Sequence, residues 1–189
     1  MEQTKTRERM KNLVILLLLV CQMPIMAQGH KGNVESCAPM KKGKVCYSDR
    51  VSVEGMSKNE LFDVIDKWAR KNYGRDVFLS NVASNKTKGS VLIGSKVELL
   101  LNDTDKTIVK YKMKIYCSDE QYEIEMTDIS YQYDPKNEKK YRNYPAESVI
   151  ANNGKDNTVA QIKDPKLFCN ATFFFAENLF GEVFDAVNE

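Results

Sequence analysis

Histidine is nearly absent from this sequence. His30 is the only histidine among 189 residues, and it lies in a segment without a periodic pattern. A Ser-His-Asp or Cys-His arrangement needs a histidine held in a rigid scaffold, and zinc sites built from imidazoles need several of them. We therefore expect no catalytic residue of these classes, no metal site and no cofactor.

Other motifs of bound ligands are missing as well. The five cysteines include no C-x-x-C pair, a spacing typical of zinc ligands. Residues 89–94 carry two glycines but lack the Gly-Lys-Ser/Thr ending of a phosphate-binding loop. Asp103 and Asp105 are not accompanied by the other oxygen ligands of a calcium loop. We interpret these two carboxylates as turn residues.

Long apolar runs are absent, and the one short run lies near the N-terminus. Four basic residues precede it, residues 13–20 are entirely apolar, and a proline and the small residue Ala27 follow. This order is typical of a secretory signal peptide, and a transmembrane helix needs about 20 apolar residues. We predict a signal peptide over residues 1–27, cleaved after Ala27, and a periplasmic or cell-surface protein. An N-terminal membrane anchor and a lipoprotein modified at Cys21 remain as alternatives.

Removal of this leader leaves no net charge. The whole chain has 28 basic and 26 acidic residues, of which the leader holds four and two, so 24 of each remain. Proteins that bind nucleic acid need a basic surface for the phosphates. We therefore expect no nucleic-acid partner, no attraction to an anionic membrane and no transmembrane segment in the mature chain.

Four cysteines remain after cleavage. An even number in an exported protein indicates disulfides, and four cysteines allow three pairings. We favour Cys37 with Cys46 and Cys117 with Cys169. The alternative is that they are buried free thiols, which are common in protein cores.

Alternation of apolar and polar residues predicts an antiparallel sheet solvated on one face. The five segments with this pattern are residues 45–53, 77–82, 90–101, 107–117 and 121–133. Residues 118–120 form a hairpin turn between the last two. Across that hairpin we expect Lys112 and Lys114 to face Glu123 and Glu125 as ion pairs, which explains the glutamates more simply than glycosidase chemistry.

Two helices complete the predicted domain. Residues 58–73 form an amphipathic helix that starts at a capping box on Ser57 and ends at Gly74 in a left-handed cap. A second helix covers residues 165–187, with a strand at 171–175 as an alternative, and its phenylalanine-rich stripe must be buried. The fold class is α+β: an antiparallel sheet of about five strands, in the order β-α-β-β-β-β-α, with one face covered by two helices.

The domain boundaries follow from composition. Residues 28–44 show little periodicity and predict a flexible N-terminal arm, and residues 45–189 predict one domain. Within it, residues 134–163 make an unusually long loop, and such loops tend to be functional or disordered. Tyrosines gather at this loop and predict an interaction surface made of Tyr131, Tyr133, Tyr141 and Tyr144. Phe173 and Phe174 on the last helix indicate a second partner surface.

Several segments resemble a secreted bacterial domain family of unknown function. They are VSV at 51–53, SKNELF at 57–62, Trp68, NY at 72–73, GSVLIG at 89–94, YKMKI at 111–115 and YEIEMTDI at 122–129. The resemblance covers residues 45–133 and implies a fold like that of the TATA-box-binding protein (TBP). Its motifs contain no catalytic residues, and a fold alone does not imply DNA binding.

These observations predict an exported module without enzymatic activity that binds a protein or another envelope ligand. One alternative is a structural subunit of a cell-envelope assembly. The other is a hydrolase that depends on carboxylates alone, because histidine is missing.

Overall fold

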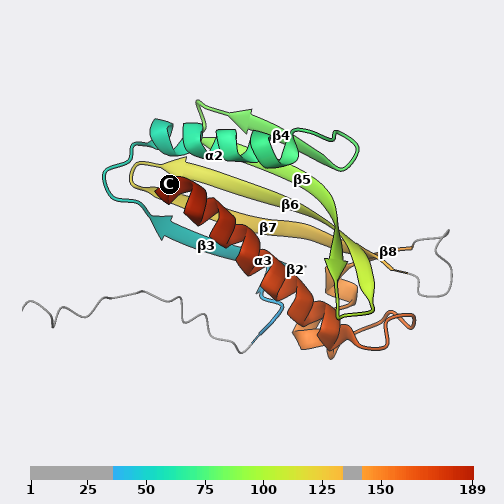
Figure 1. Ribbon diagram of the computed structural model, residues 1–189. Helices are drawn as coiled ribbons and strands as arrows, with labels where there is room; N and C mark the ends of the chain where they lie inside the picture. The colour runs from blue at the N-terminus through green and yellow to red at the C-terminus, as the bar shows by residue number, and fades with distance from the viewer. Residues whose placement is uncertain (1–35, 134–141) are drawn as a thin grey trace, which may run out of the picture. The chain divides into compact units, whose positions relative to one another are not determined.

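A computed structural model of the protein describes residues 36–133 and 142–189, shown in colour in Figure 1. The described residues belong to one compact unit. The predicted leader with Cys21 and Ala27, the histidine His30, and Tyr141 all lie outside the described residues.

The domain is built on an antiparallel sheet of six strands. Five follow the order β3-β7-β6-β5-β4, and β8 pairs with β7 beyond the end of β3. Their bounds are Tyr47–Ser52 (β3), Ser80–Asn85 (β4), Ser90–Leu100 (β5), Lys106–Ser118 (β6), Gln121–Gln132 (β7) and Asn143–Pro145 (β8). The predicted antiparallel sheet is confirmed, and β8 comes from the segment for which the sequence predicted only a loop.

Two α-helices pack on the same face of this sheet, as Figure 1 shows. They are α2 (Lys58–Tyr73), which contacts β4, β5 and β6, and α3 (Pro165–Asn188), which contacts α2, β3 and β5. The side chains that point toward the helices form the core, and its largest fully buried members include Ile93, Met113, Ile115, Tyr122, Ile124 and Tyr131. The predicted α+β class with one covered face is therefore confirmed. Among the described residues, no helix is both long and apolar enough to span a membrane.

At the ends of α2 the structure confirms the predicted capping box and contradicts the predicted C-terminal cap. Ser57 and Glu60 form the capping box at the start of α2. Gly74 ends this helix with a φ of −87°, so the predicted left-handed cap is wrong. Glycine is needed there for another reason, because a Cβ would lie 2.6 Å from the Arg70 carbonyl oxygen. Helix α3 runs unbroken through residues 171–175, which excludes the alternative strand.

A β-bulge in β7 changes which side chains face the core. Lys110 pairs with Ser130 and Lys112 with Thr127, so two residues of β7 lie opposite one residue of β6. The extra residue is accommodated at Asp128, whose φ is 52°, a conformation that aspartate tolerates better than most residues. Before the bulge the buried residues of β7 have even numbers, and after it Ile129 and Tyr131 are buried. Without the bulge, strict alternation would turn these two to solvent.

The N-terminal segment is ordered from residue 36 onward, in place of the flexible arm predicted there. Strands β1 (Met40–Lys41) and β2 (Lys44–Val45) form a hairpin. Its two-residue turn has positive φ at both central residues, Lys42 and Gly43, as a type I′ turn requires. Ala38 and Val45 are buried in the core of the domain.

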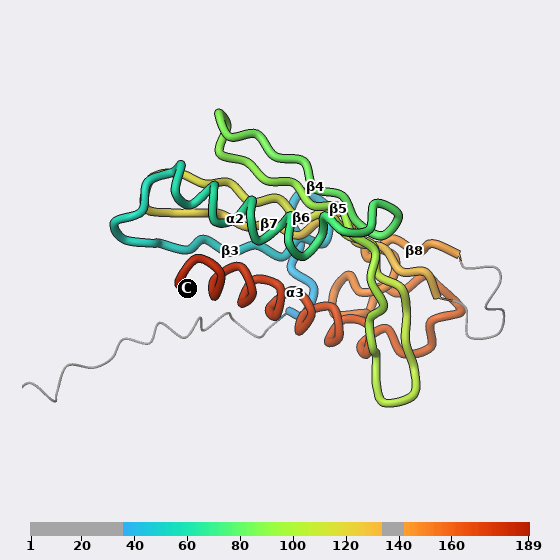
Figure 2. Tube along the Cα trace, turned by 45° about the horizontal axis from the view of Figure 1, so that its top comes forward, coloured from blue at the N-terminus to red at the C-terminus, as the bar shows by residue number. Residues whose placement is uncertain are grey.

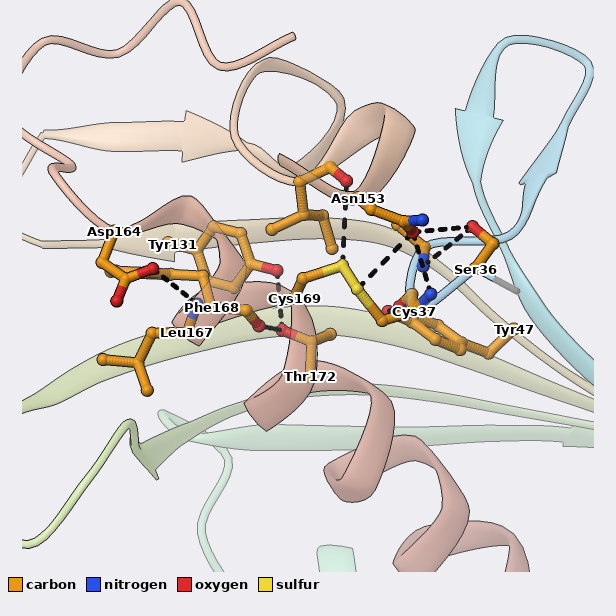
Figure 3. Close-up of a disulfide and its surroundings, with 12 residues drawn as sticks. Ser36, Cys37, Tyr47, Tyr131, Asn153, Asp164, Leu167, Phe168, Cys169 and Thr172 are labelled. Carbon is orange, nitrogen blue, oxygen red and sulfur yellow. Dashed lines mark hydrogen bonds between the residues drawn. A yellow bond between two sulfur atoms is a disulfide. The ribbon is translucent and has the colours of Figure 1, made fainter. Parts of the chain in front are cut away.

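A disulfide anchors this segment to α3, as Figure 3 shows. It joins Cys37 to Cys169, whereas Cys46 and Cys117 are buried free thiols. The favoured pairing was therefore wrong in both bonds, and the free-thiol alternative holds for two of the four. Cys117 lies at the hairpin end of β6, while Cys169 lies in the first turns of α3 beside the N-terminal segment. Only the packing of α3 across the sheet brings Cys169 to Cys37.

The described part of the predicted long loop is also ordered. After β8 it forms two short 3₁₀ helices, η1 (Ala146–Ser148) and η2 (Ala151–Gly154). Its apolar residues extend the core at one end of α3, and the buried ones are Ala146, Val149, Ile150, Val159 and Ile162. Asn153 of η2 accepts hydrogen bonds from the Cys37 N–H at 3.0 Å and from the Ser36 hydroxyl at 3.0 Å. Residues 142–163 thus connect the N-terminal segment to α3.

Candidate interaction surface

The predicted tyrosine surface does not form as such. Tyr131 is fully buried, so its assignment to a surface was wrong. Its hydroxyl lies 2.7 Å from Thr172 Oγ1 and joins β7 to α3. Tyr144 is half-buried and pairs with Tyr131 in the β7–β8 ladder, and Tyr141 lies outside the described residues.

Tyr133 contacts the β5–β6 turn instead of projecting from the surface. Its hydroxyl donates a hydrogen bond to Asp105 Oδ2 at 2.8 Å, and its ring lies edge-on to Phe168. Burial and the neighbouring Asp105 carboxylate raise the pKa of Tyr133 to about 12, so the hydroxyl stays protonated and able to donate. The backbone carbonyl of Asp105 accepts from Leu101 and Asn102. This supports the interpretation of Asp105 as a turn residue.

The second face of the sheet carries no α-helix among the described residues, and Figure 1 shows both helices on the opposite side. Because buried and exposed residues alternate along the strands, the side chains on this face can be read from the register. Its central residues lie on β5 and β6, and we call them the open face: Leu92, Lys96, Lys110, Lys112, Lys114 and Tyr116. Leu92 and Tyr116 are 38% and 45% exposed, which is high for side chains of this size. The open face therefore combines positive charge with exposed apolar surface.

The β7 margin of the open face is neutralised by ion pairs. Glu123 pairs with Arg50 of β3, and Glu125 pairs with Lys41 of the N-terminal hairpin. These contacts replace the predicted ladder, in which Lys112 and Lys114 were to pair with the two glutamates. Lys114 lies opposite Glu125 in the register, but Glu125 pairs with Lys41, which the packing of the N-terminal hairpin brings to β7.

Asp128, at the bulge, pairs with two lysines. Lys44 of β2 and Lys112 of β6 both bind its carboxylate, the second at 3.0 Å. Hydrogen bonds from Lys44 and Lys112 lower the pKa of Asp128. The bulge thus joins the N-terminal hairpin to the sheet and engages Lys112. Another cation of β6 with an acidic partner on this face is Lys106, which pairs with Glu98 of β5 at 2.8 Å.

Three lysines of the open face have no acidic partner among the described residues: Lys96, Lys110 and Lys114. Lys96 and Lys110 lie directly opposite each other across β5 and β6. The Cys117 N–H donates to the Gly89 carbonyl, so alternation places Lys96 and Lys110 in a non-hydrogen-bonded pair, the class with Cα atoms only about 4.5 Å apart. Like charges directly opposite one another destabilise a sheet. The fold therefore retains an unfavourable charge pair at the centre of an uncovered face.

Sequence reasoning found the polar alternation of β6 but not this pair. Alternation places Lys110, Lys112 and Lys114 on the outer face, as expected. The opposition of Lys96 to Lys110 depends on the β5–β6 turn, which begins after Leu100 and ends at Lys106. The sequence does not give the length of this turn, so it does not determine which residue of β5 lies opposite Lys110.

Comparison with known proteins places the fold among solved structures. Residues 47–132 match a family described as a domain of unknown function (DUF4468) with TBP-like fold. A TBP-like protein from Parabacteroides distasonis is 68% identical, with a TM-score of 0.79 over 82% of this chain and 99% of that one. A DUF4468 family protein from Bacteroides ovatus is similar in fold, with a TM-score of 0.69 and 21% identity over 81% of this chain and 91% of that one. A search of curated proteins found no significant match.

Proposed function

The chain belongs to the DUF4468 family, whose domain has a TBP-like fold, and we propose that it is an exported, non-enzymatic module that binds an acidic segment of a partner protein. The binding surface is the open face of the sheet. The observation that carries the proposal is the opposition of Lys96 and Lys110 on that face.

An anionic ligand would relieve the repulsion between these lysines. Like charges directly opposite one another on a sheet are unfavourable, and a carboxylate placed between the ammonium groups converts repulsion into two attractions. Lys114 lies on the same strand face and extends the basic surface. Leu92 and Tyr116 offer apolar contact beside it.

A protein segment fits this surface better than a nucleic acid does. The chain expected after cleavage is neutral, and the β7 margin carries the carboxylates of Glu123 and Glu125 beside the lysines. Both carboxylates are held in ion pairs, so this margin adds no free positive charge, and an extended phosphate backbone would meet only the three lysines of the open face that have no acidic partner among the described residues. A short acidic segment with apolar side chains can contact the lysines, Leu92 and Tyr116 without reaching that margin.

A structural role in a cell-envelope assembly is the second candidate. It is favoured by the outer side of α3, where Phe174 is 63% exposed and Phe184 is 48% exposed. A carboxylate-dependent hydrolase has less support, because Glu123, Glu125 and Asp128 are each engaged by a cation.

A charge-reversal variant tests the binding surface without weakening the fold. Lys96→Glu would place a carboxylate opposite Lys110, so we expect stability to rise by several tenths of a kcal/mol while affinity for a fluorescent poly-glutamate peptide falls at least about tenfold. The matched control is Lys67→Glu, which makes the same charge change on the exposed side of α2. An equal loss of affinity in both variants would show that the peptide responds only to the net charge of the protein, which would contradict the proposal. Unchanged affinity in Lys96→Glu would reject the open face as the binding site.

Export is tested separately. Full-length protein expressed in its source cell type is expected in the periplasmic or surface fraction, and N-terminal sequencing should begin at Gln28. A mature protein that retains the leader, or one that begins at a lipid-modified Cys21, would support one of the two alternatives named above.

A further inference from the structure

The edge of the sheet at β4 carries a feature that the proposed function does not use. β4 is the last strand of the sheet, and only β5 pairs with it among residues 36–133 and 142–189. Figures 1 and 2 both show it at the margin of the sheet. We propose that two copies of the protein pair through β4 and form a symmetric dimer with one continuous sheet. This inference is independent of the ligand of the open face.

The hydrogen-bonding groups available on this edge follow from the ladder. The Lys96 N–H donates to the Leu79 carbonyl at 2.8 Å, and the Gly94 N–H donates to the side-chain Oδ1 of Asn81, the residue opposite it, at 3.0 Å. Odd-numbered residues of β4 therefore bond inward to β5, and the even-numbered ones point their backbone groups outward. These outward residues are Ser80, Val82 and Ser84. The Ser80 N–H already donates to the Asp76 carbonyl, which leaves two free N–H groups and three free carbonyls.

This edge lacks the devices that usually prevent strand pairing. Exposed edges are commonly protected by charged side chains, proline or a bulge. The sequence of β4 is SNVASN, without charge or proline, and its pairing with β5 shows no register shift. The opposite edge differs, because β3 contains Asp49 and Arg50. Self-pairing of β3 centred on Arg50 would place two guanidinium groups opposite each other.

Several symmetric registers bring outward groups together, and one of them pairs all three outward residues of β4. In that register Val82 lies opposite Val82 of the second copy and Ser80 lies opposite its Ser84. This arrangement makes four hydrogen bonds from the free N–H groups of the two strands. Apolar residues meet apolar ones, hydroxyls meet hydroxyls, and no like charges face each other within the strand.

Exposed apolar residues immediately precede this edge. Val77 is 77% exposed and Phe78 is 91% exposed, while the Phe78 N–H donates to Asp76 Oδ1 in a defined turn. In the selected register they lie opposite residues 86 and 87 of the second copy, just beyond its β4. Large apolar side chains held outward by an ordered turn are typical of interaction sites. In the dimer these side chains lie against Lys86 and Thr87 of the second copy, whose aliphatic atoms they can cover.

The symmetry axis has a consequence for the rest of the molecule. In an antiparallel pair of identical strands the two-fold axis is perpendicular to the sheet, so the helices of both copies lie on one side. Both open faces then lie on the other side, and a partner with two acidic segments could bind both.

A proline in β4 tests the dimer without breaking the internal ladder. Ser84→Pro removes an outward N–H, and the matched control Ser84→Ala removes only the side-chain contact with Arg70. Each dimer loses two hydrogen bonds, each worth about a factor of five, so the dissociation constant should rise by about 25-fold or more. Sedimentation equilibrium should show a dimer for the wild type and Ser84→Ala, and a monomer for Ser84→Pro with an unchanged circular dichroism spectrum. A monomeric wild type across the accessible concentration range would overturn the proposal.

Cross-linking tests the register. In the proposed pairing Asn81 lies opposite Ala83 of the second copy, so a mixture of Asn81→Cys and Ala83→Cys proteins should form a covalent dimer under oxidation. Either variant alone should form several-fold less. Equal yields in all three samples would reject this register. A wild-type dimer that Ser84→Pro leaves intact, but that Phe184→Ser dissolves, would place the interface on α3 and also overturn the proposal.

Discussion

The disulfide between Cys37 and Cys169 should be the largest single contribution to stability outside the core. The bond can be removed without changing any atom of the sequence, by adding a reductant to the wild-type protein. Reduction leaves the N-terminal segment held by weaker contacts, among them the hydrogen bond from the Tyr47 hydroxyl to the Cys37 carbonyl at 2.7 Å. These contacts keep the folded structure similar, so most of the effect should arise in the unfolded chain.

The magnitude follows from the length of chain that the bond closes. The two cysteines are 132 residues apart, and the loop-closure entropy for that separation gives about 5 kcal/mol at 25 °C. That value is an upper bound, since strain in the native state and residual structure in the unfolded chain reduce it. Because typical domains are stable by only about 5–15 kcal/mol, this bond contributes a large share of the stability of the folded protein.

Urea unfolding with and without reductant measures this contribution. We expect a loss of about 3–5 kcal/mol on reduction, together with a steeper dependence on urea, because the reduced chain exposes more surface when it unfolds. The double variant Cys37→Ser with Cys169→Ala should behave like the reduced wild type and be insensitive to reductant. Cys46→Ala and Cys117→Ala should remain sensitive.

Two results would refute this reasoning. A loss below about 1 kcal/mol on reduction would refute loop closure in the unfolded chain as the main source of the effect. Loss of reductant sensitivity in Cys117→Ala would mean that Cys169 pairs with Cys117, the partner that the sequence first suggested.

Two further predictions concern side chains that join separate elements. Tyr131→Phe removes the hydroxyl that donates to Thr172 Oγ1, and urea unfolding should show a loss of about 1–2 kcal/mol; no loss would mean that the buried hydroxyl of Thr172 does not need this partner. Asp128→Asn removes the ion pairs with Lys44 and Lys112, which are exposed and screened, so the loss at pH 7 should be about 0.5 kcal/mol. The pKa of Asp128 is lowered in the folded state, so its contribution is present above the unfolded value of about 3.9 and is lost as pH falls below it. The difference between Asp128→Asn and wild type should therefore shrink as pH falls through the lowered pKa of Asp128 in the folded protein, and a difference that does not shrink on acidification would reject the ion pairs as its cause.

The candidate site shows where sequence reasoning reached its limit. Tyr131 and Tyr133 looked like members of a surface because they flank a segment without periodicity. In the structure Tyr131 is a core residue of β7, since the bulge at Asp128 shifts the alternation by one position. A pattern that assumes strict alternation along a strand cannot show that a bulge has shifted the core-facing positions by one residue.

The long segment between the sheet and α3 illustrates a related limit. Its described residues bury Ile150 and Ile162 through short 3₁₀ helices, whose apolar residues follow neither the helical nor the strand period. The sequence therefore offered only its length as a signal, and length pointed to a loop.

Local signals were sufficient for most of the fold. The alternation in the sheet segments, the capping box at Ser57 and the apolar stripe of α3 each reflect interactions between residues near in sequence, and they predicted most elements correctly. The strand predicted at 77–82 is the exception, because residues 77–79 form a turn and β4 runs over Ser80–Asn85. The class of the fold follows, because a half-solvated antiparallel sheet needs helices on its apolar face.

Tertiary structure alone decided the disulfide, the ion pairs and the open face. Cys37 meets Cys169, Glu125 meets Lys41, and Lys96 meets Lys110 only after strands and helices distant in sequence have packed against one another. Each of these contacts depends on register or on the angle of a helix, and neither quantity is encoded in any single segment. The sequence by itself thus determined the elements and the layered arrangement, and packing determined which side chains were left without partners on the surface.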